Sequence, residues 1–506
     1  MNYPETFKGK MVSRMSGPSG ISANALSEEV GVAQTSLSKW LREAAGVEGV
    51  AKKVNGKSNK AKGAKRPQDG TAEGKLDAVL EASSLSEQGL GAYLRRKGLH
   101  GAQLVAVFLL SAWLTPSAFA QEDSIWTRSQ LTGDWWGARS FLVDHGVSFD
   151  LEYTSSFQGL LSGSRAKDAG YGGKVDAFFN LDSGKMGLWE GGGLRTHIEY
   201  RHGDARPNVG NTLFATNTAQ LFPVGEPEEI VATSIFFTQR IGDRVNVLLG
   251  KFNPIDLFAA DPFFGGWGTR RFMNLVFVGP PSGLVPPVFM GGVANIRAKW
   301  LSWTVMVFDP NDRTTDYFPG DLFEDGVNVS TSAAHASELA GRRTTYTATV
   351  NFSTAESVDF ATLPPGIETT NKTGAFNVAF QISHNLQEST EQPEANWGFY
   401  LKAAIADGNP NYVKASLIAG IGGRALFWGR PQDSFGLGGF YYNLSDAISE
   451  SLDPFADFGD EAAVEVFYSW SVTPWFYVSG DIQFVRPARR GGDPGLVAAL
   501  RANIRF

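Results

Sequence analysis

The chain has 506 residues, with 58 glycines, 36 phenylalanines, 13 tryptophans and no cysteine. The lack of cysteine excludes disulfides, thiol catalysis and cysteine-ligated metal sites. No stretch approaches the roughly 18 uninterrupted apolar residues of a membrane helix, so an α-helical membrane bundle is excluded. A membrane β-barrel is not excluded, because its strands alternate in polarity and average out in hydropathy.

Charge and aromatic residues are unevenly distributed along the chain. Residues 1–104 hold 16 basic against 10 acidic side chains, whereas the remainder holds 29 against 42. Seven aromatic residues precede Gln121 and 55 follow from there on. Such an asymmetry indicates segments of different origin or role.

Residues 1–50 are predicted to form a helix-turn-helix-like segment. Gly31 separates two short helical patterns, and Leu37, Trp40 and Leu41 share one face of the second. A plain helical hairpin is the alternative. The segment resembles the N-terminal part of small insertion-sequence transposases at residues 3–8, 21–32 and 38–43. No acidic catalytic triad follows, so this resemblance implies at most a DNA-binding remnant. Residues 51–94, rich in lysine and glycine, are expected to be a disordered basic linker with a short helix.

Residues 95–120 have the pattern of a secretory signal peptide. Basic residues 95–97 precede the apolar run 104–114, which is too short to span a bilayer, and Ala118 and Ala120 fit a cleavage site after Ala120. A buried core helix is the alternative. The internal position indicates either a fusion of transposon debris to an exported protein or a start codon placed too far upstream. Both accounts make residues 121–506 the functional protein.

From Val147 onward the polarity period is two, as expected for β-strands. A soluble sandwich also alternates, but two features favour an outer-membrane barrel. The last strand ends in the aromatic residue Phe506 and keeps Arg501, Asn503 and Arg505 on one face. Tryptophans gather near strand ends, where the membrane interfaces would lie: Trp300, Trp303, Trp397, Trp470 and Trp475.

The predicted fold is all-β: a transmembrane antiparallel barrel over 147–506, preceded by a small α-helical segment at 121–146 on the periplasmic side. About fifteen strands can be marked, and closure needs an even number, so about 16 are expected. The missing strand is placed between Ser353 and Gly374. Turns at 241–244 and 473–475 are expected to face the periplasm, and a long loop over 309–343 to face outside.

Inward-facing charges are the first candidates for pore-lining residues. Arg195, His197, Glu199 and Arg201 lie on one strand face, where an arginine against lipid would cost about 2–4 kcal/mol at the midplane. They are therefore expected to face a wet lumen. Arg297 and Lys299 are predicted to share an inward face of another strand. Mixed donors and acceptors suit polyhydroxyl solutes.

The segment 253–290 is predicted to fold inward and constrict the pore. Aromatic faces and charged hydrogen-bonding groups would both contact a sugar ring there; an ordinary outer loop is the alternative. Its candidate residues are Asp261, Trp267, Arg270 and Arg271. The acidic loop 309–325 lacks calcium-loop spacing, so solvated charge is expected and no metal site is predicted.

Residues 121–506 resemble the carbohydrate-selective porins of the OprB type. The motifs are Leu131-Thr-Gly-Asp-Trp-Trp-Gly-Ala-Arg, Gly146-Val-Ser-Phe-Asp-Leu-Glu-Tyr, Leu249-Gly-Lys-Phe-Asn and Gly429-Arg-Pro-Gln-Asp-Ser-Phe-Gly-Leu-Gly. Trp136 stands where glycine is more typical. The resemblance implies a sixteen-stranded outer-membrane channel for monosaccharides with an eyelet lined by arginine and acid. Lys251, within the third motif, joins the predicted pore-lining set.

The predicted function is passive, carbohydrate-selective diffusion across the outer membrane of a Gram-negative bacterium. A general non-selective porin and a DNA-binding transposase-derived fusion remain as alternatives. An enzyme is not expected, since the six histidines accompany no nucleophile motif. No cofactor is predicted. Expected partners are monosaccharides or small oligosaccharides, outer-membrane lipid, and the barrel-assembly machinery through the strand ending in Phe506, with monomer and trimer both open.

Overall fold

In the computed structural model, the continuously described part of the chain begins at Ser124. The described residues are seven isolated positions before residue 41 and the ranges 124–163, 169–204, 212–223, 229–259, 261, 263–281, 284–363, 369–392, 395–453 and 457–506. The chain divides into two units, Met1–Val107 and Phe108–Phe506. Apart from those isolated positions, the predictions for 1–50, 51–94 and 95–120 lie outside the described residues.

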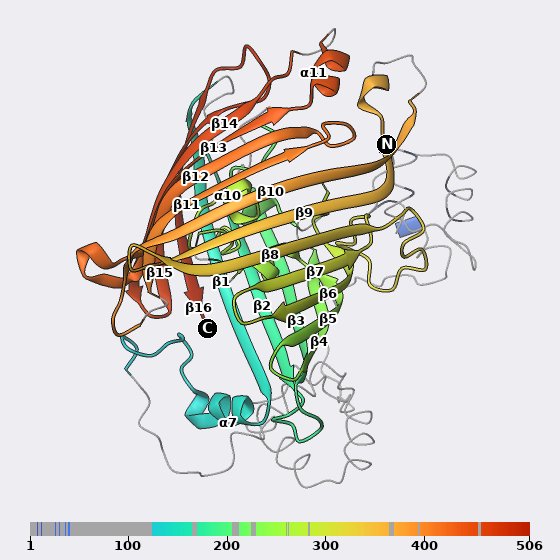
Figure 1. Cartoon of the computed structure of the whole chain (residues 1–506). Helices are drawn as coiled ribbons and strands as arrows, with labels where there is room; N and C mark the ends of the chain where they lie inside the picture. The colour runs from blue at the N-terminus through green and yellow to red at the C-terminus, as the bar shows by residue number, and fades with distance from the viewer. Residues whose placement is uncertain are drawn as a thin grey trace, which may run out of the picture. The chain divides into compact units, whose positions relative to one another are not determined.

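Sixteen antiparallel strands form one closed barrel, in which each strand pairs with its sequence neighbours and β1 pairs with β16 (Figure 1). Tyr153 of β1 lies opposite Ile504 of β16 at this closure. The predicted fold class and strand number are confirmed. The strands are β1 Val147–Ser162, β2 Ala169–Asp182, β3 Gly192–Asp204, β4 Ile230–Ile241, β5 Val245–Phe252, β6 Phe289–Arg297, β7 Ser302–Phe308, β8 Asn328–Leu339, β9 Arg342–Val358, β10 Asn371–Glu388, β11 Asn396–Ala406, β12 Val413–Ala425, β13 Arg430–Leu444, β14 Glu461–Thr473, β15 Phe476–Arg486 and β16 Gly495–Arg505.

The alternation seen in the sequence separates an apolar outer face from an inner face. On β10, Phe376, Val378 and Phe380 are 46%, 39% and 50% exposed, whereas Asn377 and Ala379 between them are buried. Large apolar side chains pointing outward all around a closed sheet are stable against lipid rather than water. Among the described residues, no helix is long and apolar enough to cross a membrane.

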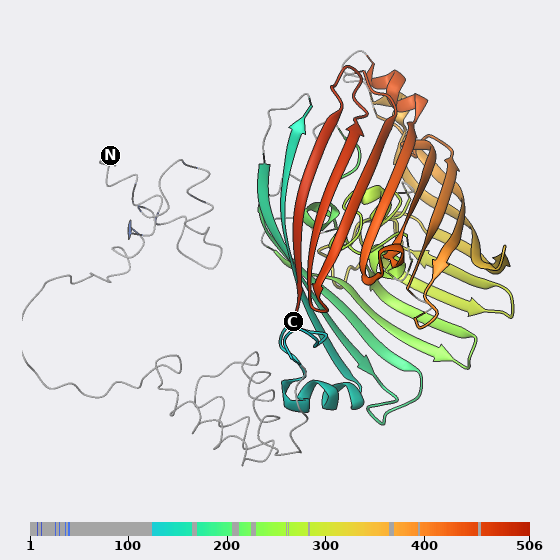
Figure 2. The same ribbon diagram turned by 90° about the vertical axis from the view of Figure 1, so that its left-hand side faces the viewer.

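The two ends of the barrel differ in the length of their connections. Turns at 242–244 and 474–475 lie at the end where β1 starts and β16 finishes, and short turns face the periplasm in barrels of this kind. Long connections lie at the opposite end, as does helix α11 (Asp446–Leu452) in Figures 1 and 2. The five tryptophans singled out in the sequence all lie near the short-turn end, in turns or at the adjoining strand termini.

Two strand predictions were wrong in detail. The stretch 309–343 is not one loop, because β8 occupies residues 328–339 and only 309–327 connect it to β7. Small and polar residues on both faces of β8, Asn-Val-Ser-Thr-Ser-Ala-Ala-His, hide its alternation. The missing strand does not lie between Ser353 and Gly374: the described residues there belong to the end of β9, the turn η4 (Phe360–Thr362) and the start of β10.

A short helix precedes the barrel, as predicted. The turn η3 (Trp135–Gly137) leads into α7 (Ala138–Asp144). Trp136 has a left-handed backbone, φ 56°, which explains why a glycine suits this position. Arg139 donates a 3.0 Å hydrogen bond to the Phe506 carbonyl and lies over the Trp135 ring. The helix is therefore tethered to the end of β16, near the C-terminus in Figure 2.

Candidate functional site

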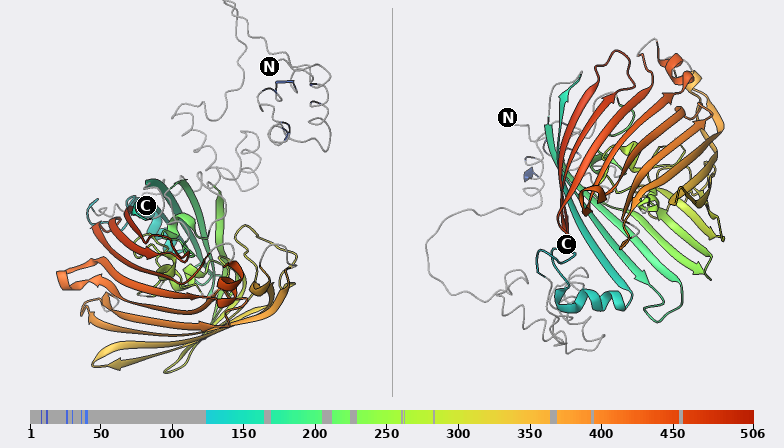
Figure 3. Two further views of the ribbon diagram at one scale, coloured as in Figure 1. Left: turned by 90° about the horizontal axis from the view of Figure 1, so that it is seen from above. Right: turned by 60° about the vertical axis from the view of Figure 1, so that its left-hand side comes forward.

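The connection between β5 and β6, residues 253–288, folds back into the barrel, and we call it the constriction loop. It contains the short helices α9 (Pro254–Phe258) and α10 (Leu275–Val278). Seen from above, green segments that include α10 lie within the ring of strands (Figure 3, left). The predicted infolding of this segment is therefore observed.

Three neighbouring strands hold the backbone of the constriction loop. Glu465 of β14 accepts hydrogen bonds from the amides of Met273 (2.5 Å) and Asn274 (3.0 Å). Arg501 of β16 donates to the carbonyls of Gly268 (2.6 Å) and Arg271 (2.7 Å). On β15 between them, Gln483 accepts a hydrogen bond from the Asn274 side chain. Buried main-chain groups need such partners, so these inward-facing polar residues fix the loop.

Packing of aromatic side chains completes the attachment. Phe263, Phe264, Phe272 and Phe277 of the loop join Tyr400, Phe440 and Phe467 of the wall in one buried cluster. The barrel wall carries a glycine where the loop carries a large ring. A Cβ at Gly436 would collide with the rings of Phe467 and Phe272. Glycine on β13 thus leaves room for the aromatic rings of the loop.

A second infolded segment, residues 212–223, lies beside the constriction loop and contains α8 (Thr218–Leu221). Its backbone pairs with the loop, since the Leu275 amide donates to the Ala215 carbonyl and the Thr218 amide to the Met273 carbonyl, both at 2.9 Å. Glu461 of β14 accepts hydrogen bonds from Leu213 and Phe214. The two segments together narrow the lumen from one side.

A cavity of about 160 Å³ lies where the constriction loop faces strands β11 to β15. Its lining combines three guanidinium groups with aromatic rings. These residues are Arg270 and Arg271 of the loop, Arg424 of β12, and Trp267, Phe435 and Tyr477. Arg270 lies over the Tyr477 ring at 5.0 Å and pairs with Glu152 at 3.4 Å.

The three arginines are close enough to influence one another. Burial lowers the pKa of Arg271 to about 10, and the positive charges of Arg424 and Arg270 act in the same direction. Arg271 donates to the carbonyls of Asp261 and Phe264, and Arg424 to that of Gln432. The hydrogen bonds of Arg271 and Arg424 go to uncharged carbonyls, whereas Arg270 pairs with the carboxylate of Glu152.

The structure brings three of the predicted residues, Trp267, Arg270 and Arg271, to this cavity. Asp261 shapes the loop instead, because its Oδ1 accepts hydrogen bonds from the amides of Phe263 and Phe264. Arg424 and Tyr477 were missed by sequence reasoning. Strand parity would have found Tyr477, but on β12 the inward face also carries the buried Ile418, which obscures the polar side.

The row Arg195, His197, Glu199 and Arg201 faces inward, but most of it is covered rather than wet. His197, Glu199 and Arg201 are at most 5% exposed. Arg201 donates to carbonyls of the infolded segment at Ala219 and Phe222. Arg195 instead lines a second cavity of about 850 Å³ at the short-turn end. The expected lining of the lumen by all four residues was therefore wrong for the three covered ones.

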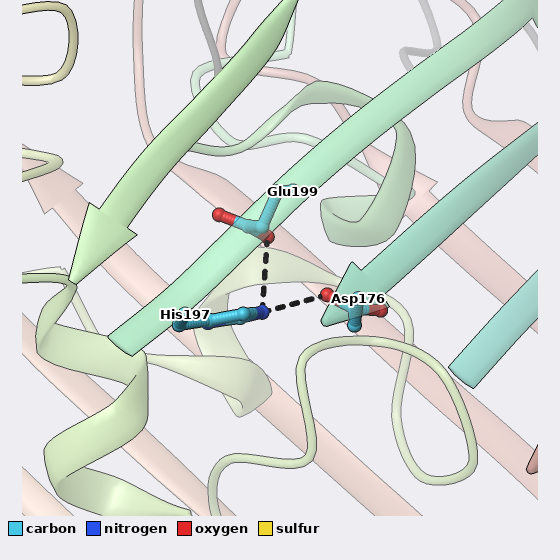
Figure 4. Close-up of side chains that lie close together, drawn as sticks. All are labelled: Asp176, His197 and Glu199. Carbon is cyan, nitrogen blue, oxygen red and sulfur yellow. Dashed lines mark hydrogen bonds and ion pairs between the residues drawn. The ribbon is translucent and has the colours of Figure 1, made fainter. Parts of the chain in front are cut away.

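The covered residues form a charge network with equal numbers of acidic and basic groups. His197 lies between two carboxylates, with Nε2 2.9 Å from Asp176 and Nδ1 2.9 Å from Asp256. Figure 4 shows His197 with Asp176 and with a third carboxylate, that of Glu199. Both ring nitrogens face acceptors, which favours the doubly protonated imidazolium. Lys174 lies 2.8 Å from Asp176 and 2.5 Å from Glu199.

Asp176, His197 and Glu199 have the spacing of metal ligands, with ligand atoms within 4.8 Å of one another. The ammonium group of Lys174 contacts both carboxylates, so the position of a cation is already taken by a side chain. The donor set does not fit a metal, since its histidine nitrogens both hydrogen-bond to carboxylates. We therefore interpret the cluster as a structural ion network.

Lys251 anchors a loop and does not line the pore. Its Nζ donates to the carbonyls of Thr314 (2.7 Å) and Asp316 (3.0 Å) and lies over the Tyr317 ring. In the same loop, 309–327, Arg313 is buried against Asp309, so the expectation of solvated charge was wrong for this pair.

The predicted pair Arg297 and Lys299 does not share a strand. Strand β6 ends at Arg297, and Lys299 lies in the exposed turn 298–301. Arg297 lines the cavity at the short-turn end together with Arg195. This second cavity lies at the short-turn end of the barrel.

Solved structures with the same architecture include Pseudomonas putida OprB. Its high-pH structure aligns over 77% of this chain and all of its own length, with a TM-score of 0.66 and 19% sequence identity. Its low-pH structure aligns over 75% and 99%, with a TM-score of 0.48 and 17% identity. Among curated proteins no match is found.

The sequence itself matches one protein family, described as carbohydrate-selective porin, OprB family, over residues 166–506. That range covers two thirds of the chain and nearly the whole barrel, including the constriction loop and every strand from β2 to β16. The chain thus belongs to the OprB family of carbohydrate-selective porins, and its barrel is an outer-membrane channel of Gram-negative bacteria rather than an enzyme.

Proposed function

We propose that small sugars diffuse passively through this barrel and are selected at the cavity beside the constriction loop. The observation that carries the proposal is the convergence of three arginines and six aromatic residues on one cavity.

The chemistry of the lining suits a polyhydroxyl solute. A guanidinium group offers five N–H donors in a rigid plane, which can replace water around sugar hydroxyls. The Arg270 guanidinium lies over the Tyr477 ring and pairs with the Glu152 carboxylate, so its orientation is fixed before the solute arrives. Trp267 supplies a flat apolar surface for the C–H face of a pyranose ring. Weak contacts of this kind favour entry without trapping the solute.

Liposome swelling tests the proposal. Vesicles with the purified protein should swell faster with glucose than with an amino acid of similar size. Arg424→Gln should reduce the preference, because it removes one donor group from the cavity. Arg343→Gln is the matched control, since Arg343 is exposed at the start of β9 and outside the cavity lining. Equal rates for both solutes in the unmodified protein would favour the general, non-selective porin.

We also propose that the mature protein starts at Gln121 and that the helix-turn-helix-like segment takes no part in transport. N-terminal sequencing of protein from isolated outer membranes should then give Gln121. An intact Met1 start in the soluble fraction would favour the DNA-binding alternative.

We propose in addition that the barrel-assembly machinery recognises β16 together with Phe506, the residue that follows it. Deleting Phe506 should therefore lower the yield in the outer membrane while leaving total synthesis unchanged. An unchanged membrane yield would contradict this role for the terminal residue.

A further inference from the structure

Trp267 reaches the cavity from an unfavourable backbone conformation. Its φ is 51°, in the left-handed region that side chains with a Cβ rarely adopt, and Gly266 and Gly268 on either side also have positive φ. Strained residues of this kind persist only where their surroundings hold them, and they gather at functional sites. The contacts of the indole ring show what holds this one.

The indole N–H of Trp267 donates a 2.6 Å hydrogen bond to Oδ1 of Asp256, from the first helix of the same loop. Asp256 is in turn held by the barrel wall: its carboxylate accepts from Ser234 of β4 (2.5 Å) and from His197 of β3 (2.9 Å). The Phe178 ring lies 5.3 Å from Trp267 and stacks on His197. The buried charge network is therefore connected, through Asp256, to Trp267, which lines the cavity.

We propose that Asp256 and His197 are positioning residues for sugar selection, which hold the Trp267 ring against the cavity as a platform for pyranose rings. Neither residue lines the cavity, and both act through the indole ring. The inference rests on the proposed role of the cavity in sugar selection and names the part of the ligand, the C–H face of the ring, that Trp267 contacts.

The electrostatics of Asp256 support this arrangement. Burial alone raises the pKa of its carboxyl, but the positive charge of His197 and the hydrogen bonds from His197, Ser234 and Trp267 outweigh burial and hold the pKa below its ordinary value. The carboxylate is thus ionised, and a charged acceptor gives the stronger hydrogen bond to the indole N–H. Asp176 lies 2.9 Å from the other ring nitrogen of His197, Nε2, and so holds the imidazole from the opposite side.

The test compares a cyclic sugar with an acyclic polyol of similar size, glucose with glucitol, in liposome swelling. A ring platform favours glucose, whereas hydroxyl-binding arginines act on both solutes. Trp267→Phe keeps a ring but loses the N–H, so the glucose-to-glucitol ratio should fall by about tenfold or more, the factor for losing one hydrogen bond to a charged acceptor. His197→Gln should lower the ratio similarly. Ion conductance without sugar should stay within the normal range, which shows that the pore still forms.

A double-variant cycle separates positioning from a general structural effect. In a Trp267→Ala background, His197→Gln should cause no further fall in the ratio, because its effect passes through the indole ring. Arg343→Gln is the control: Arg343 is exposed at the start of β9, lines neither cavity, and should leave the ratio unchanged.

The outcomes distinguish the sugar contact at Trp267 from the positioning role of Asp256 and His197. If Trp267→Ala itself leaves the ratio unchanged, the proposed sugar contact at this cavity fails. If Trp267→Ala lowers the ratio but Trp267→Phe does not, the sugar contact stands and the positioning role of Asp256 is overturned. Additive effects of His197→Gln and Trp267→Ala would also overturn the positioning role.

Discussion

Replacing Arg501 by methionine should loosen the part of the constriction loop that carries Arg270 and Arg271. The Arg501 side chain is fully buried and makes two hydrogen bonds to carbonyls of the loop, at Gly268 and Arg271. It also lies 3.5 Å from the carboxylate of Asp481 on the neighbouring strand. Methionine retains much of the side-chain volume and removes all three interactions.

The magnitude follows from these contacts. A hydrogen bond to a charged group contributes about 1.5–3 kcal/mol, so two of them make roughly 3–6 kcal/mol of loop attachment. The lower figure already changes the ratio of attached to detached loop by about 100-fold. The barrel itself should survive, because the main-chain pairing of β16 with β15 and β1 does not involve the side chain.

Single-channel recording in planar bilayers measures the effect. Arg501→Met should raise conductance and current noise, and glucose should block the current less. Arg505→Met is the control, since Arg505 lies on the same strand and face but pairs with Glu152 instead of the loop backbone. The variant Asp481→Asn/Arg501→Met separates loop release from the burial of an unpaired carboxylate. A folded Arg501→Met channel with normal conductance and normal glucose block would refute the reasoning.

Three further predictions follow from contacts near the lumen and at the barrel ends. Gly436→Val should displace Phe272 and Phe467, whose rings occupy the space that a Cβ at this position needs, and so raise conductance; unchanged conductance would contradict the tight fit. Burial raises the pKa of Asp309, but hydrogen bonds from Arg313 and two backbone amides outweigh burial and lower it. The ionised Asp309 therefore helps to attach loop 309–327 at pH values above the ordinary pKa of 3.8. This contribution is lost as the pH falls through the lowered pKa. Pepsin cleavage in that loop should therefore rise sharply at the acid end, and Asp309→Asn should show enhanced proteinase K cleavage at neutral pH. Arg139→Ala should accelerate amide exchange in residues 138–144 without affecting the barrel, because the bond to the Phe506 carbonyl is lost.

Much of the barrel could be predicted from sequence because each strand carries its own signal. Alternation places a side chain inside or outside from its neighbours alone, and an even strand count follows from closure. The same local rule explains the failure at β8, where alanine, serine and threonine on both faces carry no contrast. Aromatic and charged residues within one long segment pointed correctly to the infolding after β5.

Residues of the site were harder to predict, because strand parity says which way a side chain points and not what covers it. His197 and Arg424 both point inward, yet one is buried beneath Asp256 and the other lines the cavity. The difference depends on where a loop 59 residues further along the chain from His197 returns to the wall. Lys251 gives the same lesson, since its covering loop follows it by more than 60 residues.

The two kinds of inward-facing charge point to a division of labour in the lumen. In the network beneath the loop, Lys174, His197 and Arg201 are matched by Asp176, Glu199 and Asp256, so its charges largely cancel and rigidity remains. At the cavity, Arg271 and Arg424 are held by carbonyl oxygens, which fix the guanidinium planes without neutralising them. Charge that is matched within the protein orients the loop, and charge that is oriented but unmatched is available to a passing solute. If sugars are selected at this cavity as proposed, selectivity depends on the second group, while the first determines where that group is held.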